Sequence, residues 1–348
     1  MPGAPLRKQA PRSFARSAPA CFAMSAVPAA TSLAARAQVR CVSAACHSRV
    51  ADTSFFPLTL NPRARWANVT SPVRFPLLLH DPAECVFLSA AIAARGQWEA
   101  PWVERLLMRL WQTRHWTGRP ELFVDVGAHI GVYSLSAAYA GFPVLALEPM
   151  PYNLELMHQS LRTAPESVRR RITLIEEALS DTASRLCIRP LQSAAQPNRG
   201  NGQLAAATTC PASETVPSRT LDTVLRTLRS RDDEPCIGVA ALKIDVENHE
   251  AAVFHGASEL LSGACAPCLI HVEHDHDPAA LCATDAPDAI CILQGYGFEC
   301  SRLPGSTRDW SCVNMRLESA RRCHRWQAIS DETDEWRGVR VQRGGTGE

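Results

Sequence analysis

The stretch Phe123–Asn153, FVDVGAHIGVYSLSAAYAGFPVLALEPMPYN, decides the fold of this chain. It opens on an apolar run of the kind that forms a parallel strand covered on both faces. Gly127 and Gly131 then allow a sharp backbone turn at the start of an amphipathic helix. A second apolar strand follows at Val144–Leu147 and ends at Glu148. This order predicts the nucleotide-binding half of a doubly wound α/β sheet.

The spacing of these residues separates two classes of cofactor. A dinucleotide fingerprint has three glycines as GxGxxG, but Asp125 stands where the first glycine should be. Glu148 follows Gly127 by twenty-one residues, where a carboxylate can accept hydrogen bonds from a ribose diol. We therefore expect an adenosyl ligand without a pyrophosphate. The alternative is an ordinary βαβ unit with an incidental pair of glycines.

The first 51 residues differ in composition from the rest of the chain. They contain no Asp or Glu, seven basic residues and many Ala and Ser. This profile is typical of a transit peptide, and we expect import into a chloroplast, with the mitochondrion as the alternative. A secretory signal and an untargeted basic tail are the rival interpretations. The segment is too polar to span a membrane.

The overall charge argues against a nucleic-acid partner. The formal net charge is +1, and no basic stripe stands out beyond the first 51 residues. The chain has 14 cysteines, of which the 11 beyond residue 51 are an odd number in a chain long enough to bury its own core. We therefore expect most of these thiols to be small buried hydrophobes rather than a disulfide scaffold.

Two later stretches should lie near the ligand. A third strand at 172–175 is followed by Glu177, which could accept from an adenine amine or could be a solvated charge. The segment Arg185–Ser218 has little periodicity and should be a hairpin or a mobile loop that shapes the substrate pocket, with a turn at Asn198–Gly202.

The stretch Ala240–Glu250, AALKIDVENHE, places ionisable residues on a buried strand. Alternation puts Lys243, Asp245 and Glu247 on one side of the strand and its exit, which is costly unless they are paired. We expect Lys243 to be a buried partner of nearby carboxylates. In the class I strand order it could reach Asp125 on one side or Glu273 on the other.

A group of acids and histidines follows the next predicted strand. Its members are His271, Glu273, His274, Asp275 and His276. Their spacing does not match a known ligand pattern, so we favour a charged loop and expect no metal.

These residues carry a family resemblance. DVGAxxG followed by a strand-terminal LEP resembles motifs I and II of the class I S-adenosylmethionine methyltransferases. The blocks FVDVGAHIG, LEP, EALSD, RTLDTVL, LKIDVENHE and HGASELL follow the order of the FkbM-type methyltransferases, from about residue 80 to about 317. The resemblance implies a Rossmann-like, mostly parallel seven-stranded sheet and S-adenosyl-L-methionine as cofactor. It also implies a domain at 121–318, behind an extension with a helix at 52–120 and ahead of a polar tail at 319–348.

Two positions depart from the family's residues: His129 stands where the family often has Asn, and the pattern K-I-D-x-E-G-x-E is changed at its glycine. Asn248 replaces the glycine, and asparagine is the next most tolerant residue for a left-handed backbone. We therefore expect the turn to survive.

The resemblance and the residues together assign a site. The predicted cofactor-binding residues are Asp125, Gly127, Ala128, Gly131, Glu148, Asn153, Glu177 and Ala178. Asp245, Glu247 and His249 are the predicted catalytic residues; His249 has the best intrinsic pKa for a base, although a surface histidine at a helix start is the alternative.

The predicted reaction is O-methylation of a hydroxyl on a small molecule or glycan, with no nucleic-acid partner and no membrane span. An N-methyltransferase and a catalytically silent adenosyl-binding module are the rival functions.

Overall fold

The computed structural model describes residues 62–117, 121–192, 197–229, 236–275, 282 and 288–316. All of them belong to one compact unit, Ser43–Glu348. The predicted transit peptide at 1–51, the polar tail at 319–348 and His276 lie outside these residues. No helix in the described part of the chain is long and apolar enough to cross a bilayer.

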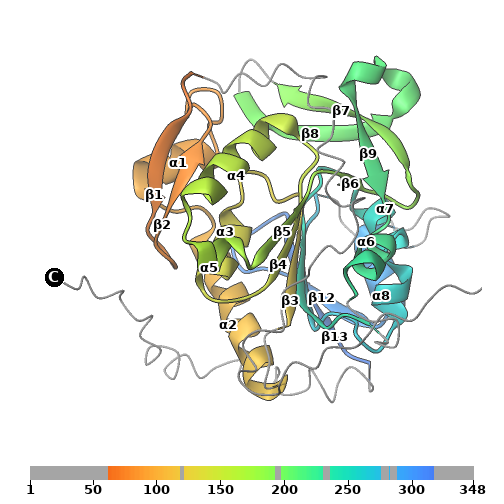
Figure 1. The fold of residues 1–348 in the computed structure, drawn as a ribbon. Coiled ribbons are helices and arrows are strands. Elements are labelled where there is room, and N and C mark those ends of the chain that lie inside the picture. The colour runs from red at the N-terminus through yellow and green to blue at the C-terminus, as the bar shows by residue number, and fades with distance from the viewer. Residues whose placement is uncertain are drawn as a thin grey trace, which may run out of the picture. The chain divides into compact units, whose positions relative to one another are not determined.

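A seven-stranded sheet in the order β12-β13-β11-β10-β3-β4-β5 forms the centre of the fold (Figure 1). Its strands are β3 (Leu122–Val126), β4 (Val144–Leu147), β5 (Ile172–Ile175), β10 (Val239–Ile244), β11 (Leu269–Glu273), β12 (Phe298–Arg302) and β13 (Asp309–Asn314). Only the pairings that involve β13 are antiparallel. The predicted fold class, a doubly wound and mostly parallel class I sheet, is confirmed.

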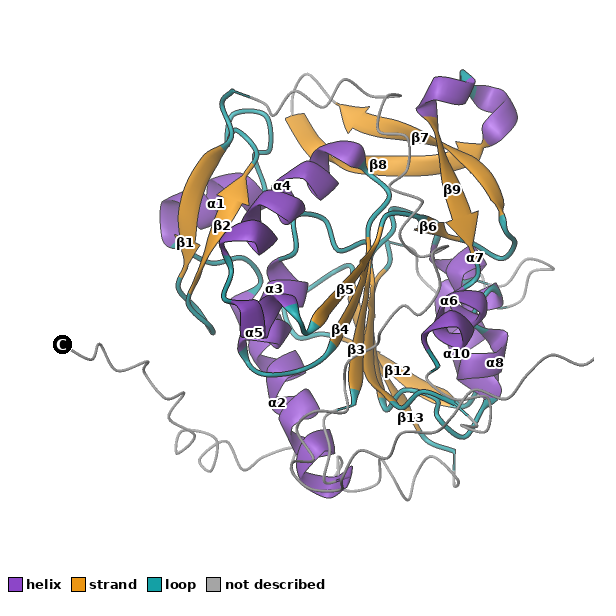
Figure 2. Cartoon of the chain, in the orientation of Figure 1, coloured by secondary structure: helices purple, strands orange, loops and turns teal. Residues whose placement is uncertain are grey.

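Helices cover both faces of this sheet (Figure 2). They are α2 (Ala100–Thr117), α3 (Val132–Tyr139), α4 (Pro151–Thr163), α5 (Glu166–Arg169), α6 (Leu221–Leu228), α7 (Glu250–His255), α8 (Ser258–Ser262) and α10 (Ala289–Gly295). A further helix, α1 (Leu88–Arg95), lies against β1 (Arg65–Val69) instead (Figure 1). Successive side chains of each strand belong to two different hydrophobic cores, because neighbouring residues in a strand point to opposite faces of the sheet. Phe123 packs in the core that includes α2 and α3, whereas Val124 packs in the core that includes α6 and α7.

A short N-terminal hairpin extends the first of these cores. Its strands β1 (Arg65–Val69) and β2 (Phe75–Leu79) are antiparallel. The backbone N–H of Leu78 donates to the Ser160 hydroxyl on α4 at 3.0 Å, which ties the hairpin to the nucleotide-binding half.

A second, four-stranded sheet in the order β6-β9-β7-β8 lies over the carboxyl end of β4 and β5 (Figure 2). Its strands are β6 (Ala178–Leu179), β7 (Ser184–Gln192), β8 (Pro197–Ala206) and β9 (Thr215–Arg219), with short 3-10 turns η4 (Ala207–Thr209) and η5 (Ala212–Glu214) between β8 and β9. The antiparallel pair β7–β8 confirms the predicted hairpin.

The predicted turn at Asn198–Gly202 is wrong, because these residues lie inside β8. Tertiary packing, rather than a turn, explains Gly200 and Gly202. A Cβ on Gly200 would lie 1.8 Å from Nε2 of His129, and one on Gly202 would lie 2.2 Å from Cε of Met150.

The expectation that most cysteines are buried thiols rather than disulfides is also wrong, since nine of the cysteines in the described residues are disulfide-bonded. Four disulfides join pairs of described residues: Cys187–Cys210, Cys236–Cys265, Cys282–Cys291 and Cys300–Cys312. Cross-strand register brings the last pair together, since residues 300 and 312 face each other across β12 and β13. The odd number of cysteines beyond residue 51 could not reveal this cross-strand pairing.

Candidate active site

The turn that follows β3 begins the site. Gly127 has a left-handed φ of 75°, and its N–H donates to the Leu147 carbonyl at 2.9 Å. A Cβ on Gly127 would lie 1.8 Å from the backbone oxygen of Asp245. The glycine is therefore required by the close approach of two neighbouring strand exits. Gly131, with a φ of 92°, is the N-cap residue that precedes α3, and a Cβ there would lie 3.2 Å from Cε of Met157.

Glu148 at the end of β4 is a buried carboxylate, only 4% exposed. It accepts hydrogen bonds from the backbone N–H groups of His129 at 2.8 Å and Met150 at 2.9 Å, and from the Asn153 amide at 3.1 Å. Burial nevertheless raises the pKa of Glu148 to about 7. A carboxylate has roughly four acceptor positions, so capacity remains for a ligand hydroxyl.

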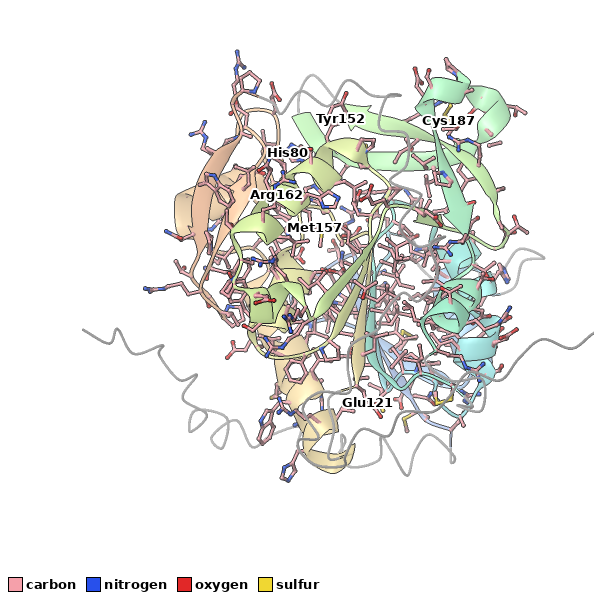
Figure 3. The ribbon with its side chains drawn as sticks, viewed as in Figure 1. His80, Glu121, Tyr152, Met157, Arg162 and Cys187 are labelled. Atoms are coloured by element: carbon pink, nitrogen blue, oxygen red, sulfur yellow. A yellow bond between two sulfur atoms is a disulfide. The ribbon has the colours of Figure 1, made fainter. Side chains whose placement is uncertain are left out.

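Asn153 on α4 supports Glu148. Its side-chain oxygen lies 2.8 Å from Nε2 of His80, which comes from the loop after β2 (Figure 3). Its amide also donates to the Gly200 carbonyl of β8 at 2.8 Å. Asn153 thus joins three segments of the chain around the predicted ribose acid.

The turn that follows β10 forms the other side of the site. Glu247 and Asn248 are consecutive residues with left-handed φ values of 54° and 73°. The Glu250 carboxylate holds this turn by accepting from the backbone N–H groups of Val246 and Asn248, at 3.2 and 3.1 Å. The expectation that asparagine takes the left-handed position of the family glycine is confirmed.

Lys243 joins the two turns. Its ammonium donates to the Gly127 carbonyl at 3.0 Å and to the Asp245 carboxylate at 3.1 Å, and lies 3.9 Å from Asp125. Burial opposes its charge, but the carboxylates of Asp245 and Asp125 outweigh burial and raise its pKa. The predicted pairing with Asp125 is confirmed. Glu273 pairs with Arg308 instead, at 2.8 Å.

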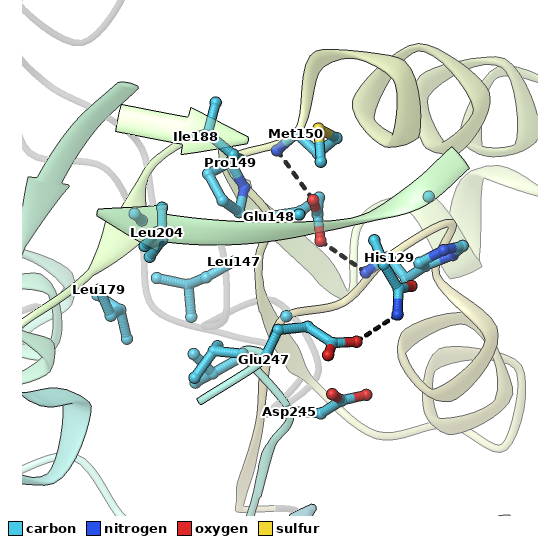
Figure 4. A pocket seen from close by; sticks show the side chains of 17 residues that line it. His129, Leu147, Glu148, Pro149, Met150, Leu179, Ile188, Leu204, Asp245 and Glu247 are labelled. Atoms are coloured by element: carbon cyan, nitrogen blue, oxygen red, sulfur yellow. Dashed lines mark hydrogen bonds between the residues drawn. The ribbon is translucent and has the colours of Figure 1, made fainter. Parts of the chain in front are cut away.

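The exits of β3, β4 and β10 meet the second sheet at a cavity with a free volume of about 60 Å³ (Figure 4). Five predicted site residues belong to its lining: Gly127, Glu148, Ala178, Asp245 and Glu247. The apolar part of the wall is Val126, Leu147, Leu179, Val246, Ile188 and Leu204. A buried acid for a ribose diol beside apolar walls for a base fits an adenosyl group.

Glu247 is a carboxyl group of the cavity lining whose pKa lies near neutrality. Burial, followed by the charge of Asp245, raises the pKa of Glu247 to about 7. Its carboxylate accepts a hydrogen bond from the Asn201 amide of β8.

Two predicted residues have other partners. Glu177 forms an ion pair with Arg219, because β6 and β9 are neighbours, and only the following Ala178 reaches the cavity. His249 is the first residue before α7, and its Nε2 lies 3.0 Å from the Ser180 hydroxyl, outside the cavity lining. Burial lowers the pKa of His249 further from a useful value. Of these two predicted catalytic residues, only Glu247 lines the cavity.

The remaining predicted residues support the lining from behind. Asp125 is fully buried and accepts from the Ser134 hydroxyl at 2.6 Å. Ala128 donates its backbone N–H to Leu147 at 3.0 Å. Asn153 donates a hydrogen bond to Glu148, and Gly131 precedes α3, as described above.

The sequence alone assigned no role in the site to Glu99 or Tyr133. The Tyr133 hydroxyl donates to Glu99 at 2.8 Å, and its ring centroid lies 5.5 Å from the Lys243 ammonium. Glu99 has a left-handed φ of 45°, and burial raises its pKa. Tyr133 is hidden in an apolar helical pattern, and no spacing rule marks it as polar support for Lys243.

The acids and histidines near β11 form pairs rather than one cluster. His271 binds Asp309 at 3.1 Å, His274 lies between Asp288 and Glu250, and Arg308 binds Asp275. Within the described residues, no group of three or more His, Cys, Asp or Glu is arranged to hold a metal ion.

The fold and the site together define an S-adenosylmethionine-dependent methyltransferase of class I. The family model for the methyltransferase FkbM domain matches residues 125–300, just over half of the chain. The chain belongs to the FkbM methyltransferase family.

Known structures with related folds are distant from this chain. Monomeric WbdD is 11% identical with a TM-score of 0.39, covering 66% of this chain and 45% of WbdD. This chain thus spans less than half of WbdD. Precorrin-6y C5,15-methyltransferase from Geobacter metallireducens is 12% identical with a TM-score of 0.32, covering 62% of this chain and 88% of its own. The glycopeptide N-methyltransferase MtfA is 14% identical with a TM-score of 0.30, covering 59% and 94%. No curated protein matches the sequence.

Proposed function

We propose that this chain is an O-methyltransferase that acts on a hydroxyl of a small molecule or glycan. The observation that carries the proposal is the Glu247 carboxylate in the cavity lining, with a pKa raised to about 7. A hydroxyl needs a base near neutrality to become a good nucleophile, and a carboxylate tuned to this range can serve.

The adenosyl half of the site binds and orients the cofactor. Glu148 is placed to accept from a ribose hydroxyl, while Leu147 and Leu179 offer an apolar surface to the adenine. S-adenosylmethionine, when bound, supplies the electrophilic methyl group. Lys243 joins the two strand exits by donating to the Gly127 carbonyl and to the Asp245 carboxylate, so that the acceptor and the cofactor meet in a fixed geometry. Such positioning can supply much of the acceleration of an in-line displacement.

The acceptor half holds and moves a proton. Glu247 takes the proton from the acceptor hydroxyl, and its neighbour Asp245 keeps the pKa of Glu247 raised. The Lys243 ammonium neutralises Asp245, which limits the repulsion between the two carboxylates. Below a pH of about 7, Glu247 is protonated and the rate of transfer to a hydroxyl should fall.

An amine acceptor is the second candidate. The cavity lining contains three carboxyl groups, those of Glu148, Asp245 and Glu247, and no Lys or Arg side chain. An ammonium group would be attracted to such surroundings. A neutral amine needs no base, so its methylation should follow the pKa of the amine rather than that of Glu247.

A methyl-tracing experiment tests the proposal. The purified protein is incubated with an extract of small molecules and glycans and with S-adenosylmethionine that carries a deuterated methyl group. We expect a labelled methyl ether in the mass spectrum and a pH profile that rises through about 7. A labelled methylamine product would show that the acceptor is an amine and not a hydroxyl. Cofactor binding with no labelled product from any extract would indicate a silent module.

We also propose import into a chloroplast, with the mitochondrion as the alternative. The support is the acid-free, Arg-, Ala- and Ser-rich composition of residues 1–51. A fluorescent protein fused behind residue 51 should enter the organelle. Diffuse cytosolic fluorescence would contradict this assignment.

A further inference from the structure

A buried ionic network lies behind the turn that carries Glu247. One oxygen of the buried Glu250 carboxylate accepts from the backbone N–H groups of Val246 and Asn248. Its other oxygen lies 3.7 Å from Nδ1 of His274, within ion-pair distance. Glu250 therefore joins the turn to a histidine that lies outside the cavity lining.

Asp288 binds the opposite side of the His274 ring. One oxygen of its carboxylate accepts from Nε2 of His274. The other accepts from the Ile290 N–H at 2.9 Å, which makes Asp288 the N-cap of α10. Both His274 and Asp288 are buried. One histidine thus lies between two buried carboxylates, where the exit of β11 meets the first residues of α7 and α10.

The charges around His274 favour its cationic form. A neutral imidazole has one N–H and can donate to only one of the two carboxylates, whereas an imidazolium donates to both. Burial opposes the charge, but the Glu250 and Asp288 carboxylates outweigh burial and raise the pKa of His274. Titratable groups on the neighbouring segments are Glu247 and His249 beside Glu250, and Arg308, Glu273 and Asp275, which pair with one another.

The turn needs support because its backbone is strained. Glu247 and Asn248 both have left-handed φ values, a conformation that side chains other than glycine rarely adopt. A carboxylate that accepts from two N–H groups of the turn can hold this conformation. An ionised carboxylate is costly to bury without a cation, and His274 supplies that cation to Glu250.

We propose that His274 is a positioning residue for methyl transfer: as the cation between Asp288 and Glu250, it holds the Glu250 carboxylate on the turn that presents Glu247 to the acceptor. The inference rests on the proposed function. His274 lies outside the cavity lining and acts through Glu250. Methyl transfer then needs Glu247 without a proton and His274 with one.

The test compares two buried histidines that each bind a carboxylate. His274→Gln removes the cation beside Glu250. His271→Gln is the matched control, because His271 is equally buried and binds Asp309 at 3.1 Å, but Asp309 begins β13 and does not hold the turn. kcat and the acceptor KM are measured with the methyl-accepting extract fraction, and affinity for S-adenosylhomocysteine is measured by calorimetry.

We expect His274→Gln to lower the maximal kcat about tenfold, because a small displacement of a reacting group is costly, with little change in the acceptor KM or in cofactor affinity. His271→Gln should keep most of the parental kcat. Equal kcat losses in the two variants of an active enzyme would overturn this inference alone. A parent chain that transfers no methyl group would overturn the proposed function and the positioning role with it.

The pH profile distinguishes positioning by charge from a structural role. His274 is cationic below its raised pKa and neutral above it, so the parental rate should fall again on the alkaline side. Asp288→Asn keeps a good N-cap residue for α10 but removes a negative charge from His274. The pKa of His274 should therefore fall, and the alkaline limb should move to lower pH. His274→Gln should lack this limb. A limb that stays in place in both variants would contradict the inference.

NMR of the labelled histidine rings gives a further test that no folding defect can spoil. In the unmodified protein, the His274 ring, assigned by its response to Asp288→Asn, should lose its proton at a higher pH than free histidine does. A ring that titrates at or below the pH of free histidine would overturn the inference, whatever the acceptor is.

Discussion

The two turns that frame the site both contain left-handed backbone conformations, but different residues adopt them. The turn after β3 uses Gly127 at a φ of 75°, whereas the turn after β10 keeps side chains at Glu247 and Asn248, with φ values of 54° and 73°. At the first turn a Cβ would strike the Asp245 carbonyl. At the second turn the Glu247 carboxylate lines the cavity. Glycine therefore occupies the turn where only backbone fits. Backbone strain is tolerated at the turn where the Glu247 side chain faces the cavity.

Lys243 makes the two turns interdependent. It donates to the Gly127 carbonyl at the first turn and to the Asp245 carboxylate beside the second. The substitutions below separate the roles of the turns, beginning with this shared residue.

Replacing Lys243 should have the largest effect. Lys243→Met leaves Asp125 and Asp245 without their cation, and losing one partner of a buried pair typically lowers the free energy of unfolding by roughly 3–5 kcal/mol. Lys243→Arg should destabilise less, by about 1–3 kcal/mol, because the larger guanidinium must fit beside the Tyr133 ring. Chemical denaturation measures both. If Lys243→Arg retains parental stability and methyl transfer, the buried-pair account fails.

Adding a methyl group to the glycine turn should come next. Gly127→Ala places a Cβ 1.8 Å from the Asp245 carbonyl and adds the cost of a left-handed alanine, together about 2–4 kcal/mol of unfolding free energy. Affinity for S-adenosylhomocysteine should fall as well. Gly305→Ala is a useful control, since this glycine also has a left-handed φ but its Cβ would meet nothing within 4 Å. Equal losses for both variants would show that φ, and not the close approach, decides the first turn.

Much of this arrangement could be predicted from the sequence. The order of apolar runs and acidic strand ends predicted a doubly wound α/β sheet, and the class I strand order offered Asp125 or Glu273 as the partner of Lys243. The resemblance to the FkbM pattern implied the left-handed position of Asn248. These features are local or follow from strand order. The partners of Glu177 and His249 could not be predicted, because β6 and β9 bring Arg219 and Ser180 to them across long separations. Asn201 reaches Glu247 from 46 residues away, and its Gly-Asn-Gly context looked like a turn.

Removing the proposed base should affect chemistry rather than stability. Glu247→Gln is expected to lower kcat about 100-fold, within the range of general base catalysis, while S-adenosylhomocysteine affinity stays within about threefold. His249→Gln should change kcat by less than about threefold. The opposite ranking would restore His249 as the base.

The pH profile sharpens this assignment. Because the raised pKa of Glu247 is near 7, the rate should rise with pH through about 7 as the carboxylate forms. Asp245→Asn removes a neighbouring negative charge, so the pKa of Glu247 should fall and the midpoint should move to lower pH. A midpoint that does not move would place the titration on another group.

The smallest effect is expected at the second turn. Asn248→Gly relieves a left-handed side chain but increases the freedom of the unfolded chain, so stability should change by less than about 1 kcal/mol. Methyl transfer should persist. A loss of more than about tenfold in kcat would show that the Asn248 side chain has a function of its own.

The measurement that tests the account most directly is calorimetric titration of S-adenosylhomocysteine into the parent chain, Glu148→Ala and Glu177→Ala. The two glutamates end neighbouring strands, but only Glu148 lines the cavity, whereas Glu177 binds Arg219. The account predicts binding to the parent, a loss of about 1.5–3 kcal/mol in Glu148→Ala for the charged hydrogen bond to ribose, and near-parental affinity in Glu177→Ala. Unchanged affinity in Glu148→Ala, or no binding to the parent, would contradict it.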